Sequence, residues 1–268
     1  MKPPPGGLFA STVPYYARFR PAYDPRLFAL LGRRFLLDGS QRVLDLGAGS
    51  GALTLPLAPL LREVIAVDPE PEMIAEGRRL AAQAGVSGIE WRLGSSDTLP
   101  AMDVGPVLLV MGAAFHWTDR ERLLRDLDIL IEPEGAVVLA TCGARHDDLE
   151  PPSWLPVVEE VRRRHLDFEH PRSSGPAGYP DVRHQEVLLR SPFSRIEEVH
   201  WDRTVSRSVE EVVGLQFSYS FTSPAALGPG RPDFERDLRQ ALNAFGPDGE
   251  SFDERVRTEA VIAVRPLG

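Results

Sequence analysis

The sequence is poor in the features that mark secreted, membrane-bound or disulfide-rich proteins. Its 268 residues include one cysteine, Cys142, and a single cysteine cannot form an internal disulfide, which suits a reducing compartment. No apolar run is long enough to cross a bilayer, and the proline- and glycine-rich residues 1–7 lack the apolar stretch of a signal peptide. We therefore expect a cytoplasmic protein without a membrane partner.

Basic character and metal-binding patterns are also scarce. The formal net charge is −9, which argues against a nucleic-acid partner because binding to nucleic acid usually requires a basic face. Four of the histidines, His165, His170, His184 and His200, are scattered without the spacing of metal ligands. Together with a lone cysteine they give no argument for zinc, so we predict no metal site. The hydrophobic share of 43% and the charged share of 26% are typical of a globular protein, and they make no prediction about its oligomeric state.

Short apolar runs alternate with helical patterns along the chain. The patterns predict strands at 42–46, 64–67, 89–93, 106–111, 136–141, 195–205 and 256–264, and helices at 27–37, 52–61, 71–84, 120–130, 208–217 and 233–245. Short, almost entirely apolar strands separated by helices indicate a parallel sheet that is covered on both faces. We predict an α/β fold with a doubly wound, seven-stranded, mostly parallel sheet.

Residues 144–192 interrupt this alternation. They contain a helical pattern around three consecutive arginines at 162–164 and a loop pattern at 172–176. We therefore predict three segments. Residues 1–143 form an N-terminal lid helix and a cofactor-binding half, residues 144–192 form an insertion that covers the substrate side, and residues 193–268 complete the same sheet.

The seven residues from Asp45 to Gly51, DLGAGSG, follow the first predicted strand directly. Glycines permit a sharp turn and a close approach of the backbone to a ligand because they have no Cβ atom. The helix that begins here offers N–H groups without partners in its first turn. Asp68 ends the second predicted strand, where a carboxylate is placed to accept hydrogen bonds from both hydroxyls of a ribose. The arrangement predicts a pocket for an adenosine-containing cofactor.

Asp45 bears on which cofactor this is. Gly47, Gly49 and Ala52 also satisfy the G-x-G-x-x-G/A fingerprint of a nicotinamide dinucleotide site. A pyrophosphate against the turn would meet the negative charge of Asp45 in a poorly hydrated crevice, which is unfavourable. A cofactor with an ammonium and a sulfonium would be attracted to that charge, and S-adenosylmethionine carries both. The alternative is that Asp45 only caps the turn.

At these positions the chain resembles the class I S-adenosylmethionine-dependent methyltransferases. The similarity begins with VLDLGAGSG at 43–51 and continues with VIAVD at 64–68, GSSDTLP at 94–100 and AFHW at 114–117. The last of these, with YARFRPAY at 16–23, is similar to a small-molecule branch that includes trans-aconitate methyltransferase-like proteins. Residues 10–142 carry most of the resemblance, which implies a Rossmann-like methyltransferase fold with S-adenosylmethionine as the cofactor.

The resemblance also implies a set of cofactor-binding residues. In chain order they are Tyr16, Arg20, Asp45, Gly47, Ala48, Gly49, Asp68, Pro69, Met73, Ser95, Ser96, Asp97 and Ala113. In many relatives the segment that reads the adenine edge begins Gly-Asp, whereas here it begins Gly94-Ser95. Either Asp97 or the Ser95 hydroxyl would then take the place of the missing carboxylate.

Methyl transfer needs the nucleophile in line with the departing sulfur, so positioning supplies much of the acceleration and no catalytic triad is required. His116 is the candidate general base because it follows the fourth predicted strand, where the crevice opens. The alternative is a structural corner made by His116 and Trp117. Tyr15, Tyr23 and Trp117 are candidate substrate-binding residues, unless the tyrosines only pack an amphipathic helix onto the sheet.

These features favour methyl transfer to a small-molecule acceptor in specialised metabolism, with oxygen favoured over nitrogen or carbon as the accepting atom. Two alternatives stay open. One is a nicotinamide-dependent oxidoreductase, which the glycines alone would also permit. The other is a non-catalytic module that binds the cofactor without turning it over.

Overall fold

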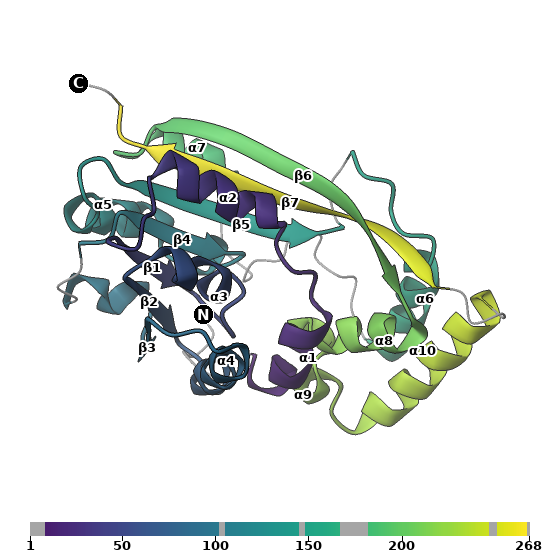
Figure 1. Ribbon diagram of the computed structural model, residues 1–268. Coiled ribbons are helices and arrows are strands. Elements are labelled where there is room, and N and C mark those ends of the chain that lie inside the picture. The colour runs from purple at the N-terminus through teal and green to yellow at the C-terminus, as the bar shows by residue number, and fades with distance from the viewer. Residues whose placement is uncertain (1–8, 102–104, 145–147, 167–181, 247–250, 267–268) are drawn as a thin grey trace.

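The computed structural model describes residues 9–101, 105–144, 148–166, 182–246 and 251–266. Seven strands form one sheet in the order β3-β2-β1-β4-β5-β7-β6 (Figure 1). Their bounds are β1 Arg42–Leu46, β2 Glu63–Asp68, β3 Ile89–Leu93, β4 Leu108–Gly112, β5 Ala136–Gly143, β6 Arg195–Arg207 and β7 Phe252–Val264. Only β7 runs antiparallel to its neighbours β5 and β6. The predicted seven-stranded, mostly parallel sheet is confirmed.

Side chains that alternate along the strands give the sheet an apolar layer on each face. On one face Leu44 of β1 packs with α5 (Arg120–Leu130) and α7 (His184–Leu189). On the other face Val43 packs with α2 (Pro25–Arg34) and α3 (Thr54–Leu57). Helix α4 (Pro71–Ala84) lies against β2 and β3. The two covered faces leave the carboxyl ends of β1, β2 and β4 along one edge, at the point where the strand order reverses.

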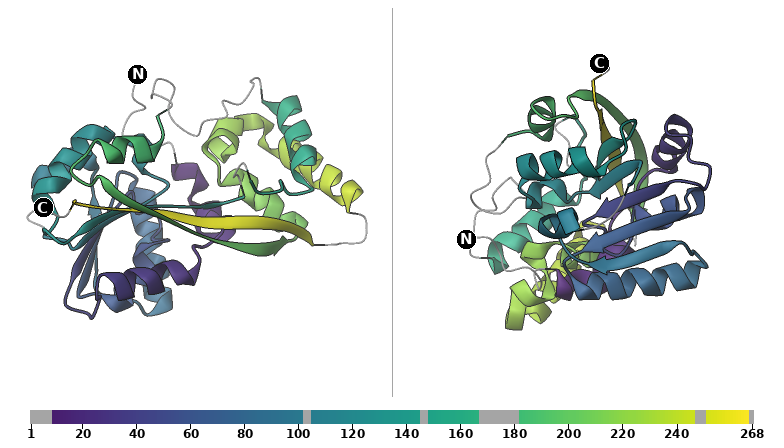
Figure 2. Two further views of the ribbon diagram at one scale, coloured as in Figure 1. Left: turned by 90° about the horizontal axis from the view of Figure 1, so that it is seen from above. Right: turned by 90° about the vertical axis from the view of Figure 1, so that its left-hand side faces the viewer.

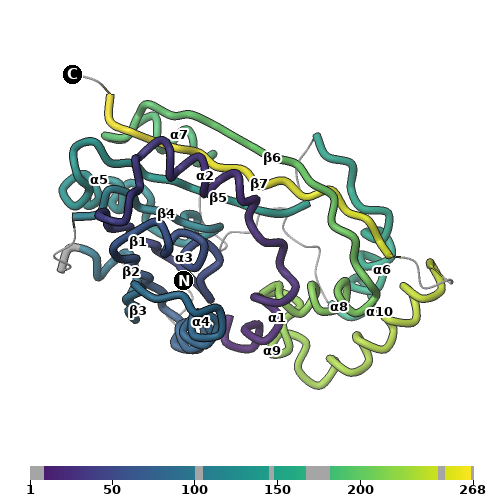
Figure 3. Tube along the Cα trace, viewed as in Figure 1, coloured from purple at the N-terminus to yellow at the C-terminus, as the bar shows by residue number. Residues whose placement is uncertain are grey.

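Five helices form a separate helical lobe beside this edge: α1 (Val13–Phe19), α6 (Leu155–His165), α8 (Val209–Phe217), α9 (Pro224–Leu227) and α10 (Arg231–Phe245). They share a core of their own that includes Phe19, Val158, Phe217 and Phe234. Helix α1 packs against α8, which is far away in the sequence (Figure 3).

The predicted insertion at 144–192 is divided between the two parts of the molecule. Helix α6 belongs to the helical lobe, where it packs against α10, whereas α7 packs against α5 and β6. The predicted loop at 172–176 lies outside the described residues. The helices of the C-terminal segment, α8 to α10, join α1 and α6, so the lobe draws on all three predicted segments.

The strands β6 and β7 connect the sheet to the helical lobe (Figure 2). Each is 13 residues long, and so longer than the predicted strands at 195–205 and 256–264. At the lobe end, Arg207 pairs with Glu254 at 2.6 Å, and both side chains are buried. A guanidinium nitrogen of Arg207 also donates to the carbonyl of Phe19 at 3.0 Å, which ties the end of α1 to the sheet.

Four elements have the predicted bounds: α4, α5, β1 and β3. The other strands of the parallel part are confirmed with shifts of up to two residues at their ends. Within the part of the chain that the structure describes, no helix has the length and apolar character needed to cross a membrane.

Candidate cofactor pocket

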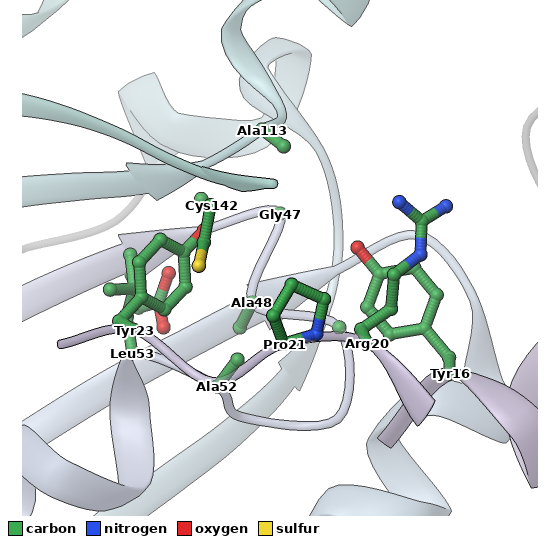
Figure 4. A pocket seen from close by; sticks show the side chains of 13 residues that line it. Tyr16, Arg20, Pro21, Tyr23, Gly47, Ala48, Ala52, Leu53, Ala113 and Cys142 are labelled. Carbon is green, nitrogen blue, oxygen red and sulfur yellow. The ribbon is translucent and has the colours of Figure 1, made fainter. Parts of the chain in front are cut away.

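A cavity opens at the carboxyl ends of β1 and β4 (Figure 4). Its lining comes from four parts of the chain: α1 with the segment after it, the end of β1 with the glycine turn, the start of the following helical region, and the ends of β4 and β5. The lining residues are Tyr16, Arg20, Pro21, Tyr23, Asp45, Gly47, Ala48, Gly49, Ala52, Leu53, Gly112, Ala113 and Cys142. The structure thus brings eight of the sequence-predicted site residues to one cavity: Tyr16, Arg20, Tyr23, Asp45, Gly47, Ala48, Gly49 and Ala113.

The turn after β1 needs its glycines. Gly47, Gly49 and Gly51 have φ values of 75°, 56° and 94°, a region that L side chains rarely adopt. A Cβ atom on Gly47 would lie 2.5 Å from the Cβ atom of Ala114, so the turn also packs closely against the segment after β4. The backbone of the turn is therefore exposed to the cavity without side chains in between.

Asp45 is buried beneath this turn, with 1% of its surface exposed. One carboxylate oxygen, Oδ2, accepts a hydrogen bond from the Thr54 hydroxyl at 2.6 Å. The other, Oδ1, is buried and has no hydrogen-bond partner among the described residues. Burial raises the pKa of Asp45 to about 7, the Thr54 hydrogen bond opposes this, and the nearby charge of Asp68 adds to it. A cationic ligand group would satisfy the free oxygen and favour the ionised carboxylate.

Asp68 lies at the end of β2 and holds the glycine turn in place. Its Oδ2 accepts from the backbone N–H of Gly49 at 2.7 Å, and its Oδ1 accepts from the N–H of Glu70 at 2.9 Å. Burial raises the pKa of Asp68, and the two backbone hydrogen bonds act against that shift. The sequence pattern placed Asp68 at the ribose but did not indicate this bridging role, because the role depends on the folded path of the turn.

Arg20 brings a positive charge to the side of the cavity that lies across from Tyr23 and Cys142 (Figure 4). Its guanidinium lies over the rings of Tyr219, at 4.1 Å from the centroid, and Tyr16, at 5.1 Å. One terminal nitrogen donates to the carbonyl of Ser218 at 3.2 Å. The Nε atom is buried and has no hydrogen-bond partner among the described residues. Arg20 is thus held by stacking while part of its donor capacity stays available to a ligand.

Tyr23, Gly112 and Cys142 all line the cavity. A Cβ atom on Gly112 would lie 2.7 Å from the Tyr23 hydroxyl oxygen, so the glycine makes room for the phenol. Burial raises the pKa of Tyr23 well above its usual value and keeps the phenol neutral. The Cys142 thiol donates to the carbonyl of Ala22 at 3.3 Å, and burial raises its pKa. Sequence reasoning did not include Gly112 and Cys142 among the site residues. A strand pattern does not reveal which residues near the end of a strand will line a cavity.

Comparison with known proteins agrees with this geometry. Residues 43–135 match the family model of a methyltransferase domain. An uncharacterised methyltransferase of Mycobacterium tuberculosis is 29% identical to the chain over 86% of this chain and 84% of its own length. The glycine turn, Asp45 and Asp68 all lie inside the matched domain. Residues 43–135 are a methyltransferase domain.

Solved methyltransferases share the fold of this chain. A protein from Anaeromyxobacter dehalogenans, assigned as a type II methyltransferase, superposes with a TM-score of 0.61 at 22% identity and covers 92% of this chain and 98% of its own. A methyltransferase of Geobacter sulfurreducens, solved with S-adenosylhomocysteine, gives a TM-score of 0.51 at 18% identity and covers 97% and 98%. The branch similar to trans-aconitate methyltransferase stays a prediction.

The remaining predicted cofactor residues of the methyltransferase lie outside the cavity lining. Pro69 is exposed and Met73 is buried in α4. Ser95 and Ser96 are half-buried, and the Ser95 hydroxyl accepts from the Asp97 N–H at 3.3 Å. Asp97 is half exposed and pairs with Arg122 at 3.4 Å. Neither candidate for the adenine-reading role faces the cavity in this arrangement, so that choice stays open.

His116 lies in a short 3-10 helix, Phe115–Trp117, directly after β4. Its ring is nearly parallel to that of His184 from α7, with centroids 6.3 Å apart. Burial lowers the pKa of His116, and the charge of Arg120 lowers it further. Burial also lowers the pKa of His184, to about 4, with smaller contributions from His116 and Arg120. Both imidazoles are therefore neutral at neutral pH, although the described cavity lining does not include His116.

The two other predicted substrate residues lie apart from the cavity. The Tyr15 hydroxyl accepts from Arg231 at 2.7 Å, and its ring packs against Phe217 in the helical lobe. Trp117 contacts the Phe9 ring edge-on, with centroids 5.8 Å apart. Tyr23, by contrast, lines the cavity together with Asp45 and the glycine turn. The predicted substrate residue thus lies among the predicted cofactor-binding residues.

Proposed function

We propose that the protein binds S-adenosylmethionine in this cavity and transfers its methyl group to a small-molecule acceptor, with oxygen favoured as the accepting atom. The observation that carries the proposal is the free, buried Oδ1 of Asp45 beneath a glycine turn. When bound, the cofactor supplies a methyl group activated by a sulfonium.

The residues present fit this cofactor in charge and in shape. Asp45 offers a negative oxygen to the ammonium of the methionine part, and Arg20 offers donors to its carboxylate. The bare backbone at Gly47 and Gly49 permits close approach, and Asp68 lies next to the turn, where it would take the ribose hydroxyls. A dinucleotide pyrophosphate would instead meet the Asp45 carboxylate, which counts against a nicotinamide cofactor.

Catalysis in this proposal rests on orientation. Holding two reactants in line contributes on the order of 7–11 kcal/mol to barrier lowering. The stacked Arg20 and the tightly packed glycine turn are fixed groups of the kind that such orientation needs. His116 would act as the general base for a hydroxyl acceptor, since its lowered pKa keeps the imidazole neutral and able to take a proton.

The helical lobe supports a small acceptor. Helix α1 and the segment that follows it pass over the cavity, so that Tyr16, Arg20 and Pro21 form part of its wall. The net charge of −9 also offers little attraction to a nucleic acid. A ubiquinone biosynthesis O-methyltransferase of Azorhizobium caulinodans, 32% identical over 37% of this chain and 40% of its own, is consistent with oxygen as the acceptor atom.

The test measures the transfer of a radiolabelled methyl group from S-adenosylmethionine to a panel of small compounds that carry a hydroxyl, a carboxyl or an amine group, or that are carbon acids. The proposal expects label in at least one hydroxyl- or carboxyl-bearing compound. His200→Ala, at an exposed position on β6, serves as the matched control for His116→Ala. Label transferred only to nucleic acid or protein would contradict the small-molecule assignment, and binding of the cofactor without any transfer would favour a non-catalytic module.

A further inference from the structure

Asp45 has an unusual position for a charged residue. Its side chain is 1% exposed, yet it lines the cavity, and only one of its two carboxylate oxygens has a hydrogen-bond partner among the described residues. The partner, Thr54, donates to Oδ2 at 2.6 Å from the first turn of α3. Asp45 is at the same time one of the residues that line the cavity in which the proposed ligand would bind. A buried carboxylate in such a position binds its proton more tightly than a carboxylate in water.

Among the described residues, no positively charged side chain acts to lower the pKa of Asp45. The titratable groups that the described part of the chain places near Asp45 are Tyr23 before α2, Asp68 at the end of β2 and Cys142 on β5. Tyr23 and Cys142 are neutral because burial raises the pKa of each, and Asp68 acts to raise the pKa of Asp45. Arg20, which also lines this cavity, lies across it from Tyr23 and Cys142 (Figure 4), and its charge acts to lower the pKa of Tyr23. Near pH 7 Asp45 is therefore a mixture of protonated and ionised forms when no ligand is bound.

We infer that Asp45 releases a proton to solvent when the ammonium group of the cofactor binds, so that uptake of the cofactor is an exchange of one cation for another. The inference rests on the proposed function, because it requires S-adenosylmethionine or its product to occupy this cavity. Only the O–H bond of the protonated carboxyl breaks, and water or buffer takes the proton. An ammonium next to Oδ1 stabilises the ionised carboxylate and so lowers the pKa of Asp45 in the complex.

The sign of the pH dependence follows from this exchange. Below the pKa of the free pocket, binding must first remove a proton from Asp45, so affinity falls as the pH falls. With a free pKa of about 7 and a much lower bound pKa, the affinity for S-adenosylhomocysteine drops about eightfold between pH 7.5 and pH 6.0. The protein releases about 0.9 proton per ligand at pH 6.0 and about 0.5 at pH 7.0.

The test is titration calorimetry of the full chain with S-adenosylhomocysteine at pH 6.0 and 7.0, in pairs of buffers that differ in ionisation enthalpy. The slope of the binding enthalpy against the buffer enthalpy gives the number of protons released. Methylthioadenosine is the ligand control, because it keeps the ribose and adenine but has no ammonium. We expect proton release with S-adenosylhomocysteine and none with methylthioadenosine.

Two variants and one control connect the proton to Asp45. Asp45→Asn keeps an acceptor for Thr54 but cannot ionise, so proton release and the pH dependence both disappear. Thr54→Val removes the hydrogen bond that lowers the pKa of Asp45, so the pH midpoint of affinity moves upward in a protein that keeps its carboxylate. Glu134→Gln, at an exposed turn, leaves both quantities unchanged.

The results distinguish this inference from the function on which it rests. Binding of S-adenosylhomocysteine with the same affinity at both pH values and no proton release would overturn the inference and leave the proposed function standing. Equal proton release with methylthioadenosine, or release that persists in Asp45→Asn, would also overturn it. No binding at any pH would overturn both.

Discussion

Replacing Asp68 by alanine tests whether the acid at the end of β2 does what its position indicates. The side chain is 6% exposed and accepts from two backbone N–H groups, those of Gly49 and Glu70. In the proposed complex it also faces the ribose. Alanine would therefore remove ligand contacts and, at the same time, the acceptor that holds the glycine turn.

The two losses have similar magnitudes, but they are measured in different experiments. Losing hydrogen bonds from a charged group to two ribose hydroxyls weakens binding by roughly 2–4 kcal/mol, or about 30- to 700-fold in Kd. Leaving two buried N–H groups unsatisfied lowers the free energy of unfolding by roughly 2–4 kcal/mol as well. Asp68→Asn keeps one acceptor oxygen, so we expect it to lose about half as much in each measurement.

Titration calorimetry with S-adenosylhomocysteine, well below the melting temperature, measures the first loss, and scanning calorimetry of the free protein measures the second. Glu72→Ala, exposed at the start of α4, is the control for removing a nearby acid. An unchanged Kd in Asp68→Ala would refute the ribose role. A lowered Tm with unchanged Kd would leave Asp68 as a purely structural support of the turn.

Three further substitutions probe other contacts. Gly112→Ala places a Cβ atom 2.7 Å from the Tyr23 hydroxyl oxygen and narrows the cavity. Such overpacking lowers the free energy of unfolding, measured in thermal melts, by about 1–3 kcal/mol. A variant with normal cofactor affinity and normal Tm would contradict the packing argument. Arg207→Ala leaves the buried carboxylate of Glu254 without its partner, which lowers the free energy of unfolding in denaturant by about 3–5 kcal/mol. A double variant with apolar residues at both positions recovers part of this stability. An equal loss of stability in the single and double variants would count against the ion pair. His116→Ala should lower turnover at least tenfold with little change in cofactor affinity, and in the unaltered protein at saturating S-adenosylmethionine, where protonation of Asp45 no longer limits binding, the acid limb of the pH–rate profile should lie below pH 6.5, because burial lowers the pKa of His116. Parallel losses of stability and activity would indicate a structural corner instead.

The sheet and its covering helices were predictable because their signal is local. Mostly apolar runs such as Arg42–Leu46 and helical patterns such as Pro71–Ala84 reflect burial on one or two faces, and their bounds agree with the structure. The strands β6 and β7 came out too short in the prediction. Along β6 most residues are exposed or half-buried, so the apolar pattern ends before the hydrogen-bonded ladder does.

The helical lobe and the finer geometry of the cavity were not predictable in the same way. Phe19 of α1 packs on Gly214 of α8, where a Cβ atom would lie 2.3 Å from the ring, and no local pattern pairs two positions so far apart. The same holds for the neighbouring rings of His116 and His184. The residue types at the glycine turn could be recognised from sequence, whereas the free oxygen of Asp45 is visible only once Thr54 is seen to satisfy the other one.

The central claim is that this cavity takes a sulfonium-type adenosine cofactor and not a dinucleotide. The most direct test is titration calorimetry of the purified protein with S-adenosylhomocysteine, alongside oxidised and reduced nicotinamide dinucleotides. We predict one-to-one binding of S-adenosylhomocysteine with a Kd on the order of micromolar, about −8 kcal/mol, and no heat from either dinucleotide. Binding of a dinucleotide alone would contradict the claim.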